Sequence, residues 1–213
     1  MAGAPDRPDA SAGVGQVDPT GTIGVLALQG GFASHARVLN SLGANVRAVR
    51  VPEDLVGLSG LVLPGGESTT MMLGIEREHL AAPIAAFVNA GNPVLATCAG
   101  TIILDDQHLA LLDISSDRNA YGGQVHSFES DLEINDGAPF CGVFIRAPRI
   151  TRTGGTVETL IEHDGEPVAI RSGKITAVTF HPELTSDDRI HRIFLHDLSV
   201  TNVSDINKKR RAA

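Results

Sequence analysis

The feature that most constrains the fold is a repeated alternation of short apolar runs and helical patterns between residues 22 and 104. The first run, residues 22–28, is followed by Gln29 and two glycines, and apolar residues then recur at helical spacing from Phe32 to Leu42. Further apolar runs separated by helical stretches lie at residues 45–51, 60–63 and 93–97. Strands that alternate with helices form parallel sheets, because each helix carries the chain back across the sheet. We therefore expect an α/β fold whose strands are buried on both faces.

The second half of the chain has a different pattern. Short β-rich segments separated by glycines lie at residues 124–134, 142–146, 157–163, 168–171 and 174–180. Apolar residues from Ile190 to Leu198 then return to helical spacing. This half is therefore expected to contain hairpins and a closing amphipathic helix.

The charge of the chain limits its partners. Of 213 residues, 25 are acidic and 17 basic, which gives a formal net charge of −8. An acidic surface repels phosphate, so nucleic acid is not an expected partner. The basic cluster at residues 208–211 falls in a terminal segment, 200–213, that we expect to be solvated, and residues 1–21 read as a flexible tail. One domain is expected over residues 22–199.

Neither a membrane nor an oxidising compartment is expected. The uncharged run at residues 80–104 is interrupted between Asn89 and Pro93, so it predicts a helix, a turn and a buried strand in place of a membrane span. Residues 1–21 lack the pattern of a secretion signal. The two cysteines, Cys98 and Cys141, have no metal-ligand spacing. The expectation is a cytoplasmic protein without a metal site.

The chemistry is expected in loops that follow the strands. In open α/β sheets, ligands bind beyond the carboxyl ends of the strands. Glycine-rich or polar segments stand at such positions in residues 29–31, 64–68 and 97–100, and residues 181–183 follow the strand predicted at 174–180.

Cys98 is a candidate nucleophile. It lies where a buried strand is expected to meet a helix, and Gly100 would permit a sharp turn there. A helix N-terminus favours thiolate, although a buried and inert cysteine would also fit this position. Cys141 opens a plain strand and is expected to pack structurally.

His181 and Glu183 can supply the base that a cysteine nucleophile needs. Pro182 disfavours helical geometry at His181, and in an extended segment residues two apart point to the same side. Glu183 could then fix the ring tautomer while the other nitrogen faces the thiol. The other histidines lack this spacing and are expected at surface or helix-face positions: His35, His79, His108, His126, His163, His191 and His196.

Acyl transfer also needs donors for a developing oxyanion. The turn at Gly65 and Gly66 allows a backbone N–H to approach a substrate closely, and we assign this role to Gly66, with Ala99 as second donor. A purely structural tight turn is the alternative. The pattern of a phosphate-binding P-loop is absent from the sequence.

Taken together, these motifs resemble the class I (triad) glutamine amidotransferase superfamily. The match is closest to the glutaminase subunits of pyridoxal 5′-phosphate synthase over LALQGG, LPGGESTTM, TCAG, DRNAYGGQVHSFESDL, VFIRAP and FHPELT, within residues 23–195. The resemblance implies a three-layer, flavodoxin-like α/β fold with a mixed, mainly parallel central sheet. It also implies hydrolysis of L-glutamine by Cys98, His181 and Glu183, with ammonia passing to a synthase subunit and with no cofactor or metal in this chain.

The resemblance also implies the residues that contact glutamine: Gly66, Glu67, Ser68, Arg118, Ile145 and Arg146. An arginine can make paired charge-assisted hydrogen bonds to a carboxylate, although either arginine could instead be a solvated charge at a strand end.

Several positions depart from the family pattern. Ala96 replaces the usual glycine two residues before the nucleophile, the 98–118 connection is short, and Gly123 and His126 replace an arginine and an aspartate. Two other interpretations stay open on sequence alone. One is a degenerate subunit that binds its synthase without glutaminase activity, and the other is another cysteine hydrolase of similar architecture.

Overall fold

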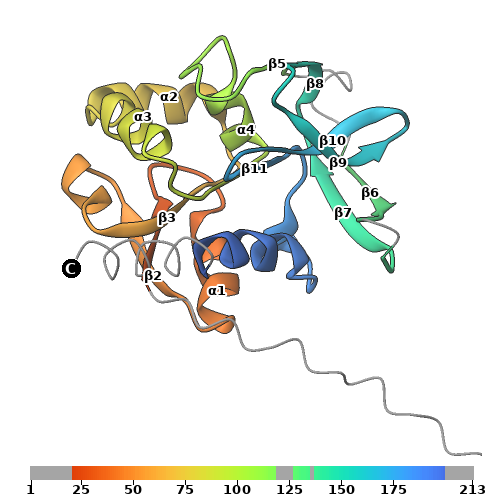
Figure 1. The fold of residues 1–213 in the computed structure, drawn as a ribbon, viewed down its shortest axis with the longest axis horizontal. Helices are drawn as coiled ribbons and strands as arrows, with labels where there is room; N and C mark the ends of the chain where they lie inside the picture. The colour runs from red at the N-terminus through yellow and green to blue at the C-terminus, as the bar shows by residue number, and fades with distance from the viewer. Residues whose placement is uncertain (1–20, 119–126, 135–136, 200–213) are drawn as a thin grey trace, which may run out of the picture.

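The computed structural model describes residues 21–118, 127–134 and 137–199 (Figure 1). The two predicted tails lie outside these residues apart from Gly21, and so do Gly123 and His126.

A mixed sheet forms the centre of the described structure. Its seven strands lie in the order β2-β1-β3-β4-β11-β10-β9. Their bounds are β1 Thr22–Leu26, β2 Asn45–Val49, β3 Leu58–Leu63, β4 Val94–Thr97, β9 Glu158–His163, β10 Glu166–Ser172 and β11 Ile175–Val178. The first five strands in this order pair in parallel, whereas β10 is antiparallel to both β11 and β9. The expected mixed, mainly parallel sheet is confirmed.

Helices cover both faces of this sheet and make three layers (Figure 1). One face packs against α2 (Ser68–Arg77), α3 (Ala81–Asn89) and α4 (Ala99–Leu104). The other face packs against α1 (Phe32–Ser41) and a helix over residues 189–199. Neighbouring side chains of one strand enter different cores, because successive side chains point to opposite faces: Leu61 and Leu63 pack under α2 and α3, and Val62 packs under α1. The predicted burial of both sheet faces is confirmed.

Short strands form two further pairs beside the sheet. The hairpin of β6 (Ser127–Leu132) and β7 (Phe140–Ile145) adds Phe144 to the core on the α1 face, where its ring stacks on Phe128 at 4.6 Å. The second pair joins β5 (Ile114–Asp117) to β8 (Arg149–Thr153). The predicted hairpins are thus present, but β5 and β8 were not expected, since both are short and mostly polar.

The helical stretch expected before Asn89 is two helices. The chain breaks between α2 and α3 at His79, whose φ is 56°. The backbone N–H of His79 donates to the carbonyl of Glu76, and that of Leu80 donates to Ile75, which closes α2. The left-handed residue turns the chain, so that α3 begins at a new angle. A single 3₁₀ turn, η1 (Pro52–Leu55), links β2 to β3.

Candidate active site

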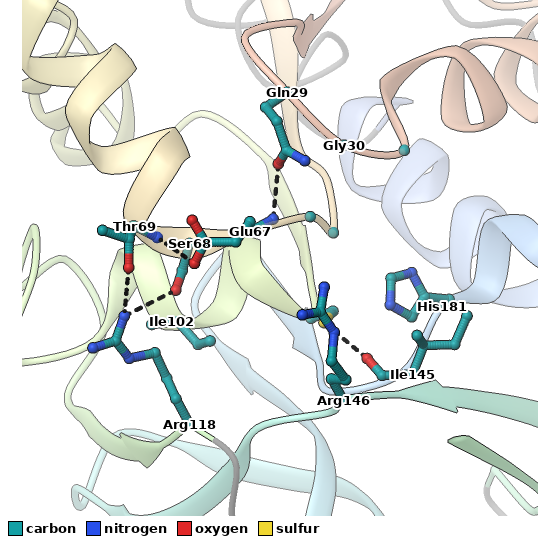
Figure 2. Close-up of a pocket in the computed structure, with 14 residues that line it drawn as sticks. Gln29, Gly30, Glu67, Ser68, Thr69, Ile102, Arg118, Ile145, Arg146 and His181 are labelled. Carbon is teal, nitrogen blue, oxygen red and sulfur yellow. Dashed lines mark hydrogen bonds between the residues drawn. The ribbon is translucent and has the colours of Figure 1, made fainter. Parts of the chain in front are cut away.

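The carboxyl ends of β1, β3 and β4 and the segment after β11 meet at one pocket of about 430 Å³ (Figure 2). The pocket is lined by Gln29, Gly30, Gly31, Gly65, Gly66, Glu67, Ser68, Thr69, Cys98, Ile102, Arg118, Ile145, Arg146 and His181. The structure thus brings together all the sequence-predicted site residues except two, which lie behind the pocket wall. These two are Ala99, the first residue of α4, and Glu183, which is 5% exposed.

Cys98 occupies a strained elbow between β4 and α4. Its φ is 46° and its ψ is −106°, a conformation that L-residues rarely adopt. Its backbone N–H donates to the carbonyl of Val178 at 2.8 Å, so the neighbouring strand β11 holds it in place. Gly100 is required for a different reason from the one expected: an added Cβ would lie 2.0 Å from the carbonyl oxygen of Leu63. The sharp turn is therefore made by Cys98 itself, and Gly100 allows α4 to pack closely against β3.

His181 and Glu183 form a hydrogen-bonded pair beside this cysteine. Nδ1 of His181 lies 2.8 Å from Oε1 of Glu183. The segment is not extended as expected, because residues Pro182–Leu184 form a 3₁₀ turn, η2. The pair still forms, since the turn folds Glu183 back under the His181 ring. Because a carboxylate oxygen only accepts, Nδ1 carries the proton and Nε2 is the nitrogen available to Cys98.

The charges of the three side chains are coupled. Burial lowers the pKa of His181, but hydrogen bonds and charges from Cys98 and Glu183 outweigh it and raise this pKa to about 10. Burial opposes ionisation of Glu183 as well, yet the hydrogen bond from His181 and the His35 ring, 3.2 Å from Oε2, hold its pKa far below the ordinary value. The Glu183 carboxylate is therefore ionised at neutral pH and favours the protonated form of the His181 ring.

The Gly65 and Gly66 turn lies against the triad. An added Cβ at Gly65 would lie 2.4 Å from Cε1 of His181 and 3.2 Å from Cβ of Cys98. The carbonyl of Gly65 accepts a hydrogen bond of 2.9 Å from the N–H of Gly31. Because the carbonyl and the N–H of a trans peptide point in opposite directions, the N–H of Gly66 points away from Gly31.

Glu67 and Gln29 anchor the loop that follows. The Glu67 side chain caps α2 by accepting from the N–H groups of Thr69 at 3.1 Å and Thr70 at 2.7 Å. A hydrogen bond from the Thr70 hydroxyl, together with these two backbone bonds, lowers the pKa of Glu67 to about 2. Gln29 accepts from the Glu67 backbone N–H at 2.7 Å (Figure 2). The sequence marked the Gln29 loop as part of the site, but it contained no signal for this contact.

The far side of the pocket carries the two predicted arginines (Figure 2). Nη1 of Arg118 donates to Oγ1 of Thr69 at 2.9 Å and approaches Oγ of Ser68 at 3.4 Å. Arg146 follows β7 with a φ of 46°, next to Ile145, whose carbonyl lies 3.9 Å from Sγ of Cys98. These contacts leave guanidinium groups at the edge of a pocket that opens onto the thiol.

Two histidines contradict the sequence-based expectation. His35 and His191 are both fully buried, and Nε2 of His35 lies 3.2 Å from Oε2 of Glu183. A signal was present, because His35 shares the apolar stripe of Phe32 and Leu39, and His191 that of Phe194 and Leu198. Sequence spacing did not distinguish this buried position from a polar helix face.

Cys141 lies away from the pocket. Its Sγ is 3.6 Å from Oε2 of Glu129, and burial together with that carboxylate raises the pKa of the thiol. Within the described residues there is no group of three or more His, Cys, Asp or Glu side chains placed to hold a metal ion. No helix in this part of the chain is long and apolar enough to cross a bilayer.

A mixed, mainly parallel sheet covered on both faces, with a cysteine at a strand-to-helix elbow and a His–Glu pair after the adjacent strand, is the arrangement expected of a glutamine amidotransferase. The comparisons with known proteins agree. Residues 25–200 match the model of the SNO glutamine amidotransferase family. The chain belongs to this family.

Individual relatives show the same relationship. The pyridoxal 5′-phosphate synthase subunit PdxT of Thermotoga neapolitana is 47% identical over 81% of this chain and 97% of its own length. The protein of that name from Deinococcus radiodurans is 48% identical over 82% and 95%. A crystal structure of a glutamine amidotransferase superposes with a TM-score of 0.78 at 42% identity, covering 83% of this chain and 98% of that one. The structure of PurLQS from Thermotoga maritima shares the fold at a TM-score of 0.65 and 16% identity, covering 87% of this chain and 98% of its own.

Proposed function

We propose that this chain hydrolyses the side-chain amide of L-glutamine, with Cys98 as nucleophile, His181 as general acid and base, and Glu183 as the group that orients His181. The observation that carries the proposal is the placement of Cys98 and His181 at the pocket, with Nδ1 of His181 hydrogen-bonded to Glu183 behind the pocket wall and Nε2 left to face Cys98. The catalytic domain comprises residues 22–199.

The reaction follows from this geometry. The Cys98 sulfur attacks the amide carbon of glutamine, and the carbon–nitrogen bond breaks as His181 donates a proton from Nε2 to the leaving nitrogen, which departs as ammonia. Water then attacks the thioester while His181 accepts its proton. Glutamate leaves and the Cys98 sulfur is regenerated. Glu183 stays ionised throughout and stabilises the imidazolium.

The negative charge that develops on the amide oxygen needs N–H donors. We assign these to Gly66 in the turn after β3 and to Ala99, whose N–H is among those at the start of α4 that have no acceptor within the helix. Gly66 follows the neighbouring strand β3, and Ala99 follows Cys98 directly in the sequence.

The polar pocket wall accounts for amino-acid recognition. Arg118 and Arg146 suit the α-carboxylate of glutamine, since guanidinium and carboxylate make paired hydrogen bonds. The Glu67 carboxylate, ionised at any neutral pH, suits the α-ammonium group. Gly66, Ser68 and Ile145 complete the contacts with the substrate.

The partner is proposed from the relatives. Proteins of this family carry the name of a pyridoxal 5′-phosphate synthase subunit, so we propose that ammonia passes to a separate synthase subunit of that enzyme. The two free cysteines suit a reducing cytoplasm. A glutaminase that released ammonia without an acceptor would waste glutamine, so we expect its activity to depend on the synthase. The turn at Gly65 and Gly66 is the proposed switch, because glycine tolerates both peptide orientations and synthase binding can select the competent one.

The direct test compares the two cysteines. We expect Cys98→Ala to abolish ammonia release from glutamine in the presence of the cognate synthase, because no other nucleophile lines the pocket at the elbow. Cys141→Ala is the matched control and should keep nearly full activity. Mass spectrometry should find a glutamine-analogue electrophile on Cys98. Labelling of Cys141 in its place would contradict the assignment.

A further inference from the structure

A buried chain of polar side chains continues behind the proposed triad. Oε1 of Glu183 bonds to His181, and Oε2 of the same carboxylate lies 3.2 Å from Nε2 of His35. Nδ1 of His35 lies 3.0 Å from Nε2 of His191, and both rings are fully buried. Nothing in the proposed hydrolysis uses these two histidines.

The tautomers of both rings follow from their partners. The Glu183 carboxylate can only accept, so Nε2 of His35 must carry a proton. Nδ1 of His35 then accepts from Nε2–H of His191. Burial and the neighbouring His35 lower the pKa of His191 to about 3, so His191 is neutral at pH 7. With the proton on Nε2, its Nδ1 is an acceptor, and this atom has no hydrogen-bond partner among the described residues. A buried ring nitrogen without a proton costs less to leave without a hydrogen bond than a buried N–H group does.

The position of the Glu183 carboxylate depends on this ring. Nε2 of His35 hydrogen-bonds to Oγ1 of Thr97 at 3.1 Å, so Oε2 of Glu183, 3.2 Å from the same nitrogen, has this ring as its polar neighbour without a hydrogen bond of its own in the described structure. Glu183 is packed from the other side by Gly31, where an added Cβ would lie 2.9 Å from Oε1. With its side chain almost completely buried, Glu183 has no solvent to orient or stabilise its second oxygen.

We propose that His35 is a positioning residue, which holds the Glu183 carboxylate ionised and aimed at His181, and that His191 fixes the tautomer in which His35 can do so. The proposal rests on the glutaminase function proposed above. His35 does not line the pocket, so it acts through Glu183 and not on the substrate. The titratable groups around this row of buried side chains are Cys98 and His181 on the substrate side, and Asp188 and His191 where the helix over residues 189–199 begins.

The test uses full-length protein with its synthase and measures ammonia release from glutamine against pH. In His35→Leu we expect kcat to fall about 10- to 100-fold, as for outer-shell partners elsewhere, with KM within about twofold. The acid limb of kcat/KM reports the coupled titration of the triad, and a Glu183 carboxylate that is harder to ionise should move this limb to higher pH. An unchanged acid limb in a folded His35→Leu protein would overturn the proposal.

Two amide variants separate positioning from packing. Glutamine places an N–H where Nε2 stands, whereas asparagine reaches the place of Nδ1. His35→Gln should therefore recover much of kcat and the wild-type acid limb, and His35→Asn should not. This comparison holds even if His35→Leu fails to fold, and equal activities of the two amide variants would refute the role.

A destabilised control and a substrate-free readout complete the design. Ile84→Ala removes a buried side chain of α3 far from the triad, so it should lower the melting temperature without moving the acid limb. A limb that moves equally in Ile84→Ala would assign the effect to stability alone. If wild-type protein releases no ammonia, the proposed function fails, but iodoacetamide labelling of Cys98 against pH still tests His35. The labelling profile should shift in His35→Leu and be restored in His35→Gln.

Discussion

Single residues at the site have backbone conformations that they would rarely adopt outside this fold. Left-handed backbone at a non-glycine residue such as Cys98 costs about 1–3 kcal/mol. The surrounding structure offsets this strain, because the Cys98 N–H and the Thr101 hydroxyl both donate to the carbonyl of Val178, at 2.8 and 2.7 Å. In this conformation the thiol lies at the pocket.

The glycine next to the triad gives a prediction for a single residue. Gly65→Ala places a methyl group 2.4 Å from Cε1 of His181, so the ring must move. Because misplacement of a catalytic group by about 1 Å can cost about 100-fold in rate, kcat should fall by about that factor or more. Steady-state ammonia release measures this fall. Gly155→Ala, whose Cβ would meet nothing within 4 Å, is the control and should behave as wild type. A fully active Gly65→Ala would contradict the prediction, because it would show that the His181 ring can move without loss of catalysis.

The site is formed by loops that each lead from a strand into a helix. β3 leads through the glycine turn into α2, and β4 leads through Cys98 into α4, so the start of each helix faces the pocket. At α2 this start depends on Glu67, which caps the helix and presents Ser68 and Thr69 to Arg118. Stability and substrate contacts therefore depend on the same carboxylate.

The cap of α2 gives a prediction about pH. Glu67→Gln should lower the free energy of unfolding at pH 7 by about 1 kcal/mol, typical of a lost N-cap. The folded-state pKa is depressed to about 2, so the stabilisation is present above the unfolded value near 4.5 and is lost as pH falls toward 2. Urea unfolding should show the wild-type advantage shrinking over that range. Glu78→Gln, which breaks an exposed pair with Arg77, is the control and should change stability little.

At the scale of the whole molecule, the site exists because parallel strands end at one edge of the sheet. Residues from the loops after β1, β3, β4, β7 and β11 meet there, although they lie far apart in the sequence. Two separate cores, one on each sheet face, hold those strand ends in register. The turn at Gly65 and Gly66 is the part of this edge that backbone rotation can most easily change.

Gating by the synthase is the prediction at this scale. The Gly65 carbonyl is held by one hydrogen bond from Gly31, so a docked partner could change the orientation of this peptide without altering the core. The isolated chain should hydrolyse glutamine slowly, and cognate synthase should raise kcat about tenfold or more. Ammonia release with and without synthase, together with gel filtration of the mixture, tests this. A fully active isolated chain that forms no complex would favour a stand-alone amidase.

Much of the fold and the Cys98, His181 and Glu183 part of the candidate site could be predicted because their signals are local. Apolar runs and helical periodicity mark the strands and helices from Thr22 to Leu104, and the position of Cys98 after a strand and before a helix follows from the same pattern. His181 and Glu183 are two residues apart, so their pairing is also encoded locally, even though the segment is a 3₁₀ turn and not extended.

The tertiary structure alone decided the rest. The pairing of polar β5 with β8, the bond from Gln29 to Glu67, and the contacts of His35 with Glu183 and His191 join residues that no period or spacing relates. A histidine on an apolar helix stripe is buried only if another element packs over it and supplies hydrogen-bonding partners. Local sequence determines which face of a helix is apolar, whereas the packing of distant elements determines which polar groups meet beneath that face. The physical reason is that a polar group can be buried without a large cost only where the fold brings a hydrogen-bonding partner to it.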